Sequence, residues 1–314
     1  MLLAALPAPA LAQGGTNGPL EGPGGWLFAP WERPDRMELR GMPRVAALFR
    51  QVAALLAAAG IRPGFLLVPA KARVHRDSLP PGLSFTPEGA RRHAAMLEEL
   101  RPAFPLLPDL DAAFAAARQA QPGEELFFRA DSHWRPEAAA LAAAEVARLL
   151  PAAAPLPPAR ALGLALGPEE TRLRTQLDLA QLLPPARRAA FPPEPYRIRP
   201  PQRARPSALL DAAPAEVAVV GSSLVAPELN FHAELSARLG RPVSLHWRVQ
   251  TRGPFDILLT YLRGEGFRQE RPRLLLLCQP ESGLMFGPES RAVYPETAMA
   301  PEAFLAGVRQ ALAP

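Results

Sequence analysis

Short apolar runs alternate with segments of helical spacing along most of this chain. In the helical segments the apolar residues recur every three or four positions, which is the repeat of one face of an α-helix. Alternating strands and helices indicate an α/β fold with a mostly parallel sheet covered on both faces. The uninterrupted apolar run at 274–277 is typical of a central strand. Strands are predicted at residues 64–69, 125–131, 216–221, 243–249 and 273–279.

Start and stop signals support the helical segments. Thr86 before Pro87 combines a capping residue with the residue that favours the first position of a helix. Pro136 begins another helix, which is expected to run to about Leu150. An amphipathic helix ends at Gly60, and further helices are predicted at 227–239, 254–262 and 301–312.

Residues 151–206 interrupt the alternation. This segment is rich in proline and arginine, and only one helix, near 176–183, is predicted within it. One interpretation is a solvated loop excursion; the other is a segment that borders a site and contacts an acidic polymer. No internal repeat and no second domain is evident, so residues 13–314 are expected to form one domain that contains this excursion.

The first twelve residues read MLLAALPAPALA. They resemble the apolar stretch of a secretory signal, with Ala10-Leu11-Ala12 as an A-x-A cleavage site. A positively charged n-region is missing, so the true start is expected to lie upstream. The alternative is a disordered tail. Export to the periplasm through this signal is the preferred interpretation. No run in the sequence reaches the roughly 18 to 20 apolar residues that a membrane span needs.

Composition and charge argue against nucleic-acid binding. The 40 prolines and the near absence of lysine, with Lys71 as the only one, indicate a GC-rich coding bias. The net charge of +5 is modest, and no basic helix or aromatic-basic repeat points to nucleic acid. An anionic polymer or a membrane surface is one interpretation of this charge, but an ordinary soluble surface is the preferred one.

Asp131 and His133 follow the apolar run at 125–131 and precede the proline that starts a helix. Side chains two residues apart in extended backbone point the same way, so Asp131 could accept a hydrogen bond from His133 and fix its tautomer. α/β folds place their sites at the carboxyl ends of strands. Spacing alone leaves a second interpretation open, in which Asp131 or Ser132 only satisfies free amides of the following helix.

The sequence Gly221-Ser222-Ser223 ends another apolar run. A glycine there would allow a sharp bend that exposes a hydroxyl and backbone N–H groups, which could bind a developing oxyanion. Gly-Ser pairs are also ordinary turn residues, so this motif alone is weak. If the two segments meet in space, they supply a nucleophile, a base and a carboxylate that orients the base.

The sequence Asp-Ser-His-Trp at 131–134, followed by Arg-Pro-Glu, resembles the DxHW signature of the AlgX/AlgJ group of SGNH-hydrolase-like polysaccharide O-acetyltransferases. Other segments are similar to this group in the same order. They are GGWLF at 24–28, LLVPAK at 66–71, VVGSS at 219–223 and the strand-like segment 271–282. The resemblance spans roughly residues 24–284, and DxHW is its most specific part.

This resemblance implies a three-layer α/β/α fold and a triad with Ser223 as nucleophile, His133 as base and Asp131 as orienting carboxylate. It implies acetyl transfer through an acyl-serine intermediate to hydroxyls of an exopolysaccharide in the periplasm. A membrane-bound O-acyltransferase would supply the acetyl group, and no cofactor is needed. A carbohydrate acetyl esterase with the same triad and a non-catalytic periplasmic scaffold are the alternatives.

Several side chains are secondary candidates for substrate binding. Ser222 stands where the family has Asp or Thr, and Lys71 lies in a matching segment, where a role near the site competes with a solvated or ion-paired one. Trp134 is most simply a packing anchor behind the Asp-x-His turn. Arg252 and Tyr261 follow a predicted strand and could face the cleft.

A metal site is not expected. The histidines outside the triad do not combine with cysteines or carboxylates at the spacing of metal ligands. They are His75, His93, His232 and His246.

Overall fold

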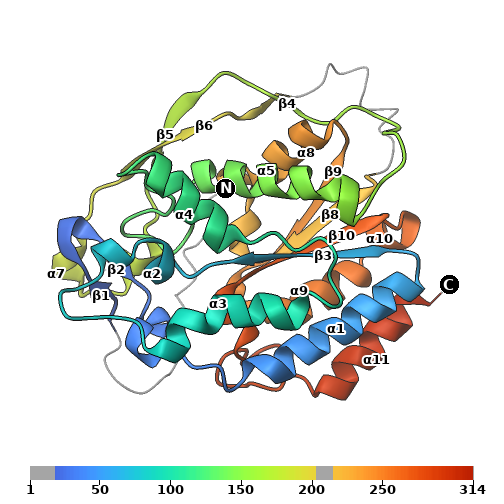
Figure 1. Ribbon diagram of the computed structural model, residues 1–314, viewed down its shortest axis with the longest axis horizontal. Helices are drawn as coiled ribbons and strands as arrows, with labels where there is room; N and C mark the ends of the chain where they lie inside the picture. The colour runs from blue at the N-terminus through green and yellow to red at the C-terminus, as the bar shows by residue number, and fades with distance from the viewer. Residues whose placement is uncertain (1–17, 203–214, 314) are drawn as a thin grey trace.

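The computed structural model describes residues 18–202 and 215–313. At its centre lies a parallel four-stranded sheet with the order β3-β10-β8-β9 (Figure 1). The predicted α/β class is therefore confirmed. The strands are β3 (Arg62–Val68), β10 (Leu274–Pro280), β8 (Val217–Gly221) and β9 (Val243–Trp247).

Strand β10 is the central strand that the apolar run at 274–277 predicted. Leu276 lies between Gly64 of β3 and Val219 of β8, and all residues from 274 to 279 are buried. A strand with neighbours on both edges and helices on both faces exposes no side chain, which explains the continuous apolar sequence. Beyond β3, an isolated parallel bridge between Gly64 and Leu106 widens the sheet.

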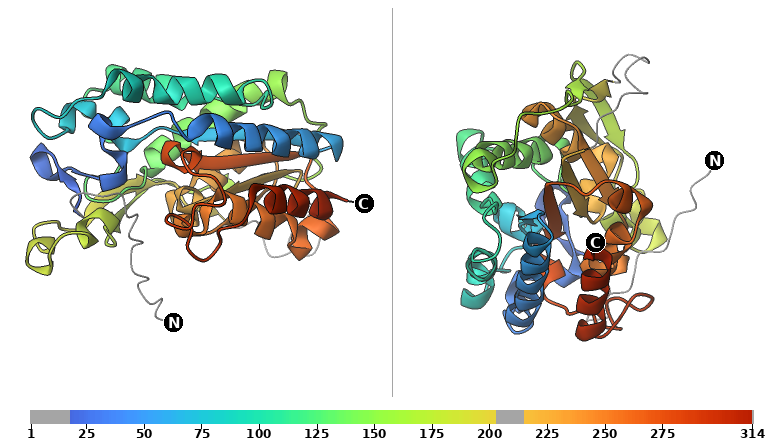
Figure 2. Two further views of the ribbon diagram at one scale, coloured as in Figure 1. Left: turned by 90° about the horizontal axis from the view of Figure 1, so that it is seen from below. Right: turned by 90° about the vertical axis from the view of Figure 1, so that its right-hand side faces the viewer.

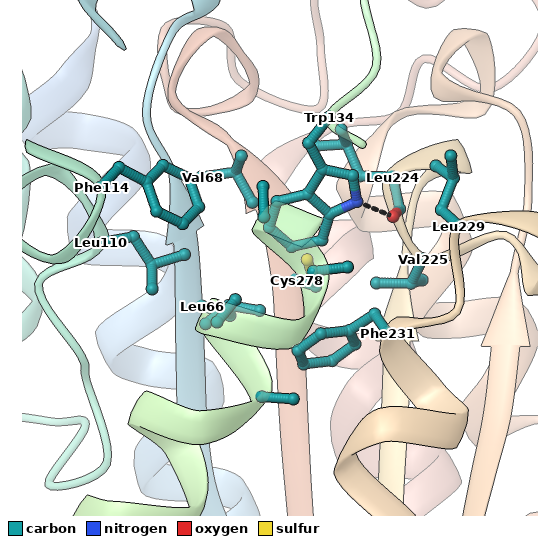
Figure 3. Packing of buried hydrophobic residues seen from close by; sticks show 14 of the residues in the cluster. Leu66, Val68, Leu110, Phe114, Trp134, Leu224, Val225, Leu229, Phe231 and Cys278 are labelled. Carbon is teal, nitrogen blue, oxygen red and sulfur yellow. Dashed lines mark hydrogen bonds between the residues drawn. The ribbon is translucent and has the colours of Figure 1, made fainter. Parts of the chain in front are cut away.

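One face of the sheet packs against α4 (Leu110–Ala120), α5 (Pro136–Ala153) and α8 (Phe231–Leu239). Figure 3 shows the centre of this layer, where the Trp134 indole lies over Cys278 with Val68 and Leu224 on its two sides. The rings of Trp134 and Phe231 are 5.8 Å apart, between centroids. This packing fixes the residue next to His133 in the core.

The opposite face carries the alternate side chains of the same strands, including Phe65, Leu275 and Leu277. The longer helices that follow cover it, and Figures 1 and 2 show the two helical layers on opposite sides of the sheet. This arrangement has the three layers that the resemblance implied. The helices are α1 (Met42–Ala58), α3 (Pro87–Leu100), α9 (Gly253–Leu262) and α11 (Pro301–Leu312).

The predicted helix boundaries hold at most positions. Thr86 caps α3 by accepting a hydrogen bond from the Gly89 amide at 2.9 Å, and α5 begins at Pro136. The helix predicted at 227–239 is interrupted, because Asn230 adopts a left-handed conformation with φ of 66°. A short 3-10 turn, η7 (Pro227–Leu229), precedes that residue, and α8 follows it. Asparagine tolerates this conformation better than most residues.

The strand predicted at 125–131 is absent. Residues 126–135 instead form a loop that folds back on itself, which we call the DSHW loop. Its Phe128 amide donates to the His133 carbonyl at 3.2 Å, and Phe127 forms an isolated antiparallel bridge with Trp134. The prediction was wrong because the apolar side chains of this run are buried by the folding of the loop against the core. Burial of this kind does not require the backbone to join the sheet.

The excursion at 151–206 contains ordered ribbons rather than only a solvated loop. Strands β5 (Glu170–Arg174) and β6 (Glu194–Ile198) pair antiparallel, and β4 (Ala165–Leu166) pairs with β7 (Pro201–Gln202). The helix predicted near 176–183 is the shorter α6 (Asp178–Gln181), followed by α7 (Pro185–Arg188). Figures 1 and 2 place α7 at one end of the molecule.

Smaller elements complete the described chain. Strands β1 (Leu20–Glu21) and β2 (Leu27–Phe28) pair antiparallel, α2 (Lys71–Val74) follows β3, and α10 (Glu265–Gln269) precedes β10. Among the residues described, no helix is long and apolar enough to cross a membrane. The signal-like residues 1–12 lie outside the described part of the chain.

Candidate active site

The site lies at the carboxyl edge of the sheet, where β8 ends at Gly221. A Cβ atom on Gly221 would lie 2.6 Å from the carbonyl oxygen of Cys278, so only glycine lets β8 and β10 approach this closely. The φ angle of Gly221 is not positive. The glycine is therefore needed for close packing beneath the site and not, as predicted, for a sharp bend.

The two serines that follow Gly221 have different surroundings. Ser222 is buried, with 1% of its surface exposed, and its hydroxyl accepts a hydrogen bond from the Leu224 amide at 3.5 Å. Ser223 is partly exposed and begins the 3-10 turn η6 (Ser223–Val225). Its Oγ lies 2.8 Å from Nε2 of His133. The structure thus brings Ser223, and not Ser222, to the histidine.

Asp131 holds the other side of the same imidazole. Its Oδ1 accepts hydrogen bonds from the His133 backbone amide at 2.9 Å and from His133 Nδ1 at 2.6 Å. The carboxylate binds a backbone amide and orients the ring at the same time. This geometry arises in a turn and not from the extended backbone that the spacing suggested. Neither Asp131 nor Ser132 caps α5, so the helix-capping interpretation was wrong.

Lys71 lies behind the DSHW loop with only 2% of its surface exposed. Its Nζ donates to the carbonyl oxygens of Leu27 at 2.5 Å, Arg129 at 2.8 Å and Asp131 at 3.0 Å. Burial lowers the pKa of Lys71 to about 8, so the ammonium group remains charged at neutral pH. Lys71 is therefore buried and not solvated, and it lies beside the site, although its amine faces three carbonyl groups and not the serine. It holds the loop to β2.

Trp134 is fully buried, in agreement with the packing-anchor interpretation and not with a contact to substrate. Its indole Nε1 donates to the Leu224 carbonyl at 2.7 Å, as the dashed line in Figure 3 shows. The residue after His133 is thereby bound to the residue after Ser223.

Two side chains that the sequence analysis did not single out complete the site. Arg174, at the end of β5, faces the second oxygen of Asp131, with Nε and Nη2 both 3.1 Å from Oδ2. The Asp178 amide donates to the same oxygen at 3.3 Å, and the Asp178 carboxylate accepts from the Ser132 amide at 2.6 Å and from the Ser132 hydroxyl. In the sequence, only the arginine-rich character of the segment 151–206 and the helix predicted near 176–183 pointed to these two residues.

The charges around the imidazole set the protonation of the three acidic and basic groups. Burial disfavours the charged form of His133, but the charge and hydrogen bond of Asp131 outweigh it and raise its pKa. Burial alone would raise the pKa of Asp131, yet His133 and then Arg174 hold it well below its usual value. Burial, followed by the negative charge of Asp131, raises the pKa of Asp178. Asp131 is therefore the more acidic of the two carboxyl groups.

Arg252 and Tyr261 do not reach this group. The Arg252 guanidinium pairs with Asp256 at 2.8 Å, just beyond the carboxyl end of β9. The Tyr261 ring packs against His246 and Phe267, on the face of the sheet opposite Trp134. Neither residue contacts the serine or the histidine, so the structure does not support their prediction as cleft residues.

Three side chains of the site lie close enough to be considered as metal ligands. Oxygen and nitrogen atoms of Asp131, His133 and Asp178 lie within 4.8 Å of one another. The atoms that would bind a metal already have other partners. His133 Nδ1 is hydrogen-bonded to Asp131, and the Arg174 guanidinium faces the same carboxylate. A cation would have to compete with this guanidinium, so the arrangement does not favour one. The absence of a metal stays a prediction.

A serine, histidine and aspartate joined by hydrogen bonds at the carboxyl edge of a parallel sheet form the arrangement of serine hydrolases and acyltransferases. Residues 20–277 match the family described as "SGNH hydrolase-like domain, acetyltransferase AlgX". Because this match covers most of the chain, the protein belongs to that family. The resemblance drawn from the DxHW segment is confirmed.

Sequence relatives agree with this assignment. The chain is 27% identical over 287 residues to a probable alginate O-acetylase AlgJ of Azotobacter vinelandii, covering 85% of this chain and 70% of the relative. It is 29% identical over 273 residues to the corresponding Pseudomonas fluorescens protein, covering 82% and 66%.

Solved structures share the fold. The O-acetyltransferase domain of Pseudomonas putida AlgJ superimposes with a TM-score of 0.73 at 24% identity, covering 93% of this chain and 99% of that one. Pseudomonas aeruginosa AlgX gives a TM-score of 0.63 at 19% identity, covering 92% of this chain and 67% of that one. The expected SGNH-hydrolase-like fold is thus confirmed.

Proposed function

We propose that this protein is a periplasmic O-acetyltransferase that moves an acetyl group through an acetyl-serine intermediate to hydroxyls of an exopolysaccharide. The family makes acetyl transfer the activity class, and relatives named alginate O-acetylases support a polysaccharide acceptor. The observation that carries the proposal is the 2.8 Å contact between His133 Nε2 and Ser223 Oγ, with Nδ1 of the same ring held by Asp131.

The first half-reaction acetylates Ser223. His133 Nε2 takes the hydroxyl proton as Ser223 Oγ attacks the acetyl carbonyl of the donor. Asp131, already bound to Nδ1, stabilises the imidazolium that forms. The bond from the acetyl carbon to the donor oxygen then breaks, and that oxygen takes the proton from His133. The products are the deacetylated donor and acetyl-Ser223.

The second half-reaction repeats these steps with a sugar hydroxyl. His133 accepts the proton of the hydroxyl while its oxygen attacks the acetyl carbon, and the proton returns to Ser223 Oγ as the ester to the enzyme breaks. Transfer wins over hydrolysis when the bound acceptor lies closer to the acyl-enzyme than water does.

The backbone offers a donor for the oxyanion in both halves. Ser223 is the first residue of η6, so its N–H has no acceptor within that turn. An N–H at this position can stabilise the negative oxygen that forms next to the nucleophile.

Two further parts of the proposal concern the source of the acetyl group and the route of export. An acetyl donor on the periplasmic side would come from a membrane-bound O-acyltransferase, and the signal-like residues 1–12 would direct export. Both rest on the resemblance and on the sequence, and they are independent of the triad.

Incubation of the purified protein with an activated acetyl ester, with and without an alginate-derived oligosaccharide, tests the function. Acetylated sugar supports transfer, whereas free acetate alone, unchanged by the sugar, would indicate an esterase. No serine-dependent turnover would indicate a scaffold. Ser223→Ala is expected to abolish turnover and Ser222→Ala to retain it; the reverse result would contradict the assignment of the nucleophile.

A further inference from the structure

Asp131 is completely buried, and its two oxygens have separate partners. Oδ1 binds His133 through the ring and the backbone, and Oδ2 faces the Arg174 guanidinium and the Asp178 amide. A carboxylate with both oxygens engaged in this way has one orientation available to it. The orientation of the imidazole therefore depends on the groups that hold Oδ2.

A second carboxylate competes for the same imidazole. One oxygen of Asp178 lies 3.7 Å from His133 Nδ1, while Asp131 lies at 2.6 Å. A small rotation of the ring toward Asp178 would move Nε2 away from Ser223. The two carboxylates differ in their contact with a cation, because the Arg174 guanidinium lies 3.1 Å from the carboxylate of Asp131.

Arg174 is itself held in place. Its side chain is 15% exposed, its guanidinium lies 5.6 Å from the centre of the Phe128 ring, and Glu228 lies 3.8 Å away on its solvent side. A planar group that stacks on an aromatic face and directs two N–H groups at one carboxylate is a property of arginine that lysine does not share.

The cross-strand partner of Arg174 binds the same loop. Glu194 of β6 lies opposite Arg174 in the ribbon, and its carboxylate accepts hydrogen bonds from the Arg129 and Ala130 amides, both at 2.7 Å. One pair of facing residues thus fixes the backbone before Asp131 and the carboxylate of Asp131. The β5–β6 ribbon is docked on the DSHW loop at this point.

We propose that Arg174 is a positioning residue, which selects Asp131 over Asp178 as the partner of His133 and so keeps the imidazole directed at Ser223. The consequence for catalysis rests on the proposed function, while the effect on the imidazole does not. Arg174 acts through Asp131 and, with its Nη2 3.4 Å from His133 Nδ1, also lies against the imidazole on the side away from Ser223. It does not contact Nε2 of His133 or Oγ of Ser223, the atoms that react.

The test compares Arg174→Met and Arg174→Lys with Arg172→Met. Arg172 lies on the same side of β5, is exposed and pairs with Glu170, which makes it a matched control. The profile of kcat/KM against pH with an activated acetyl ester gives the first readout. The charged groups that face His133 are Asp131, Asp178 and Arg174.

Loss of the positive charge in Arg174→Met is expected to move the acidic limb of the profile to higher pH, because His133 then binds its proton more tightly. Above this limb kcat/KM is expected to fall on the order of tenfold or more, because the carboxylate is no longer held. Arg174→Lys keeps the charge, so its limb is expected to stay in place while the plateau falls. Arg172→Met is expected to behave as wild type.

The titration of His133, followed by NMR of histidine-labelled protein, gives a readout that needs no activity. A raised His133 pKa in Arg174→Met supports the proposal even if the wild-type protein proves not to turn over acetyl esters, in which case only the proposed function fails. If Arg174→Met does not fold, Arg174→Lys decides, and wild-type kcat/KM at every pH would overturn the proposal. A uniform loss at every pH with an unchanged His133 titration would also overturn it.

Discussion

The indole Nε1 of Trp134 donates a hydrogen bond to the carbonyl oxygen of Leu224 at 2.7 Å, and these two residues directly follow His133 and Ser223 in the sequence. The bond is buried in the core between the sheet and α5. It joins the loop that carries the base to the turn that carries the nucleophile, so it fixes the distance between them.

Trp134→Phe removes this bond and leaves the Leu224 carbonyl without its donor. An unsatisfied buried group of this kind costs about 1 to 3 kcal/mol, and kcat/KM is expected to fall on the order of tenfold because the two segments are no longer joined. Urea denaturation and ester turnover measure the two effects. Trp247→Phe, at a half-buried position on β9, is the control. Equal losses in both variants would show that the bond has no special role.

The two carboxylates beside His133 are expected to differ sharply on amidation. Asp131→Asn removes the negative charge that supports the imidazolium and should lower kcat on the order of 10³- to 10⁴-fold. Asp178→Asn should cost less than about tenfold, because burial and Asp131 raise the Asp178 pKa and its carboxyl group binds Ser132 rather than the imidazole. Steady-state kinetics of both variants test this, and a similar loss in the two would contradict the assigned roles.

Lys71→Met is expected to destabilise the fold. The substitution takes the ammonium donor from the carbonyl oxygens of Leu27 and Asp131, while the Arg129 carbonyl keeps its hydrogen bond from the Leu27 amide at 2.8 Å. A loss of about 3 kcal/mol in the free energy of unfolding is therefore expected. Arg91→Met, on the exposed side of α3, should leave stability within about 0.5 kcal/mol of wild type. Urea denaturation measures both; an unchanged midpoint for Lys71→Met would show that the ammonium group does not hold the loop.

Acid is expected to destabilise the protein through His75. This ring packs on Trp26 with 4.2 Å between centroids, its Nε2 has no hydrogen-bond partner, and burial, followed by the charges of Arg118 and Lys71, lowers its pKa to about 3. Between pH 6.5 and 3 the unfolded chain binds a proton that the folded chain does not, so stability falls as the pH falls through this range.

His75→Phe removes the group that takes up this proton on unfolding. Between pH 7 and 5 the variant should lose about 2 kcal/mol less stability than the wild-type protein. Urea denaturation at the two pH values measures the difference. An identical loss in both proteins would mean that His75 is protonated within the fold.

The sequence predicted those parts of the fold and the site for which a single segment has a recognisable pattern. The apolar run at 274–277 predicted the central strand, and Asp131, His133 and Ser223 were singled out from their motifs and resemblance. The run at 125–131 misled because apolar side chains beneath a loop and in a strand have the same composition. Arg174 was missed because its contact with Asp131 depends on the pairing of β5 with β6, which no local pattern in a proline-rich segment encodes.

The burial of Lys71 has a practical consequence for any test of the proposed membrane partner. It is the only lysine of the chain, and its amine is enclosed by three carbonyl groups. Apart from the amino terminus, the folded protein therefore offers no primary amine to common cross-linking reagents. A complex with an acyltransferase would escape lysine-directed capture, whereas reagents that couple carboxylates would find exposed groups such as Glu228 near the site.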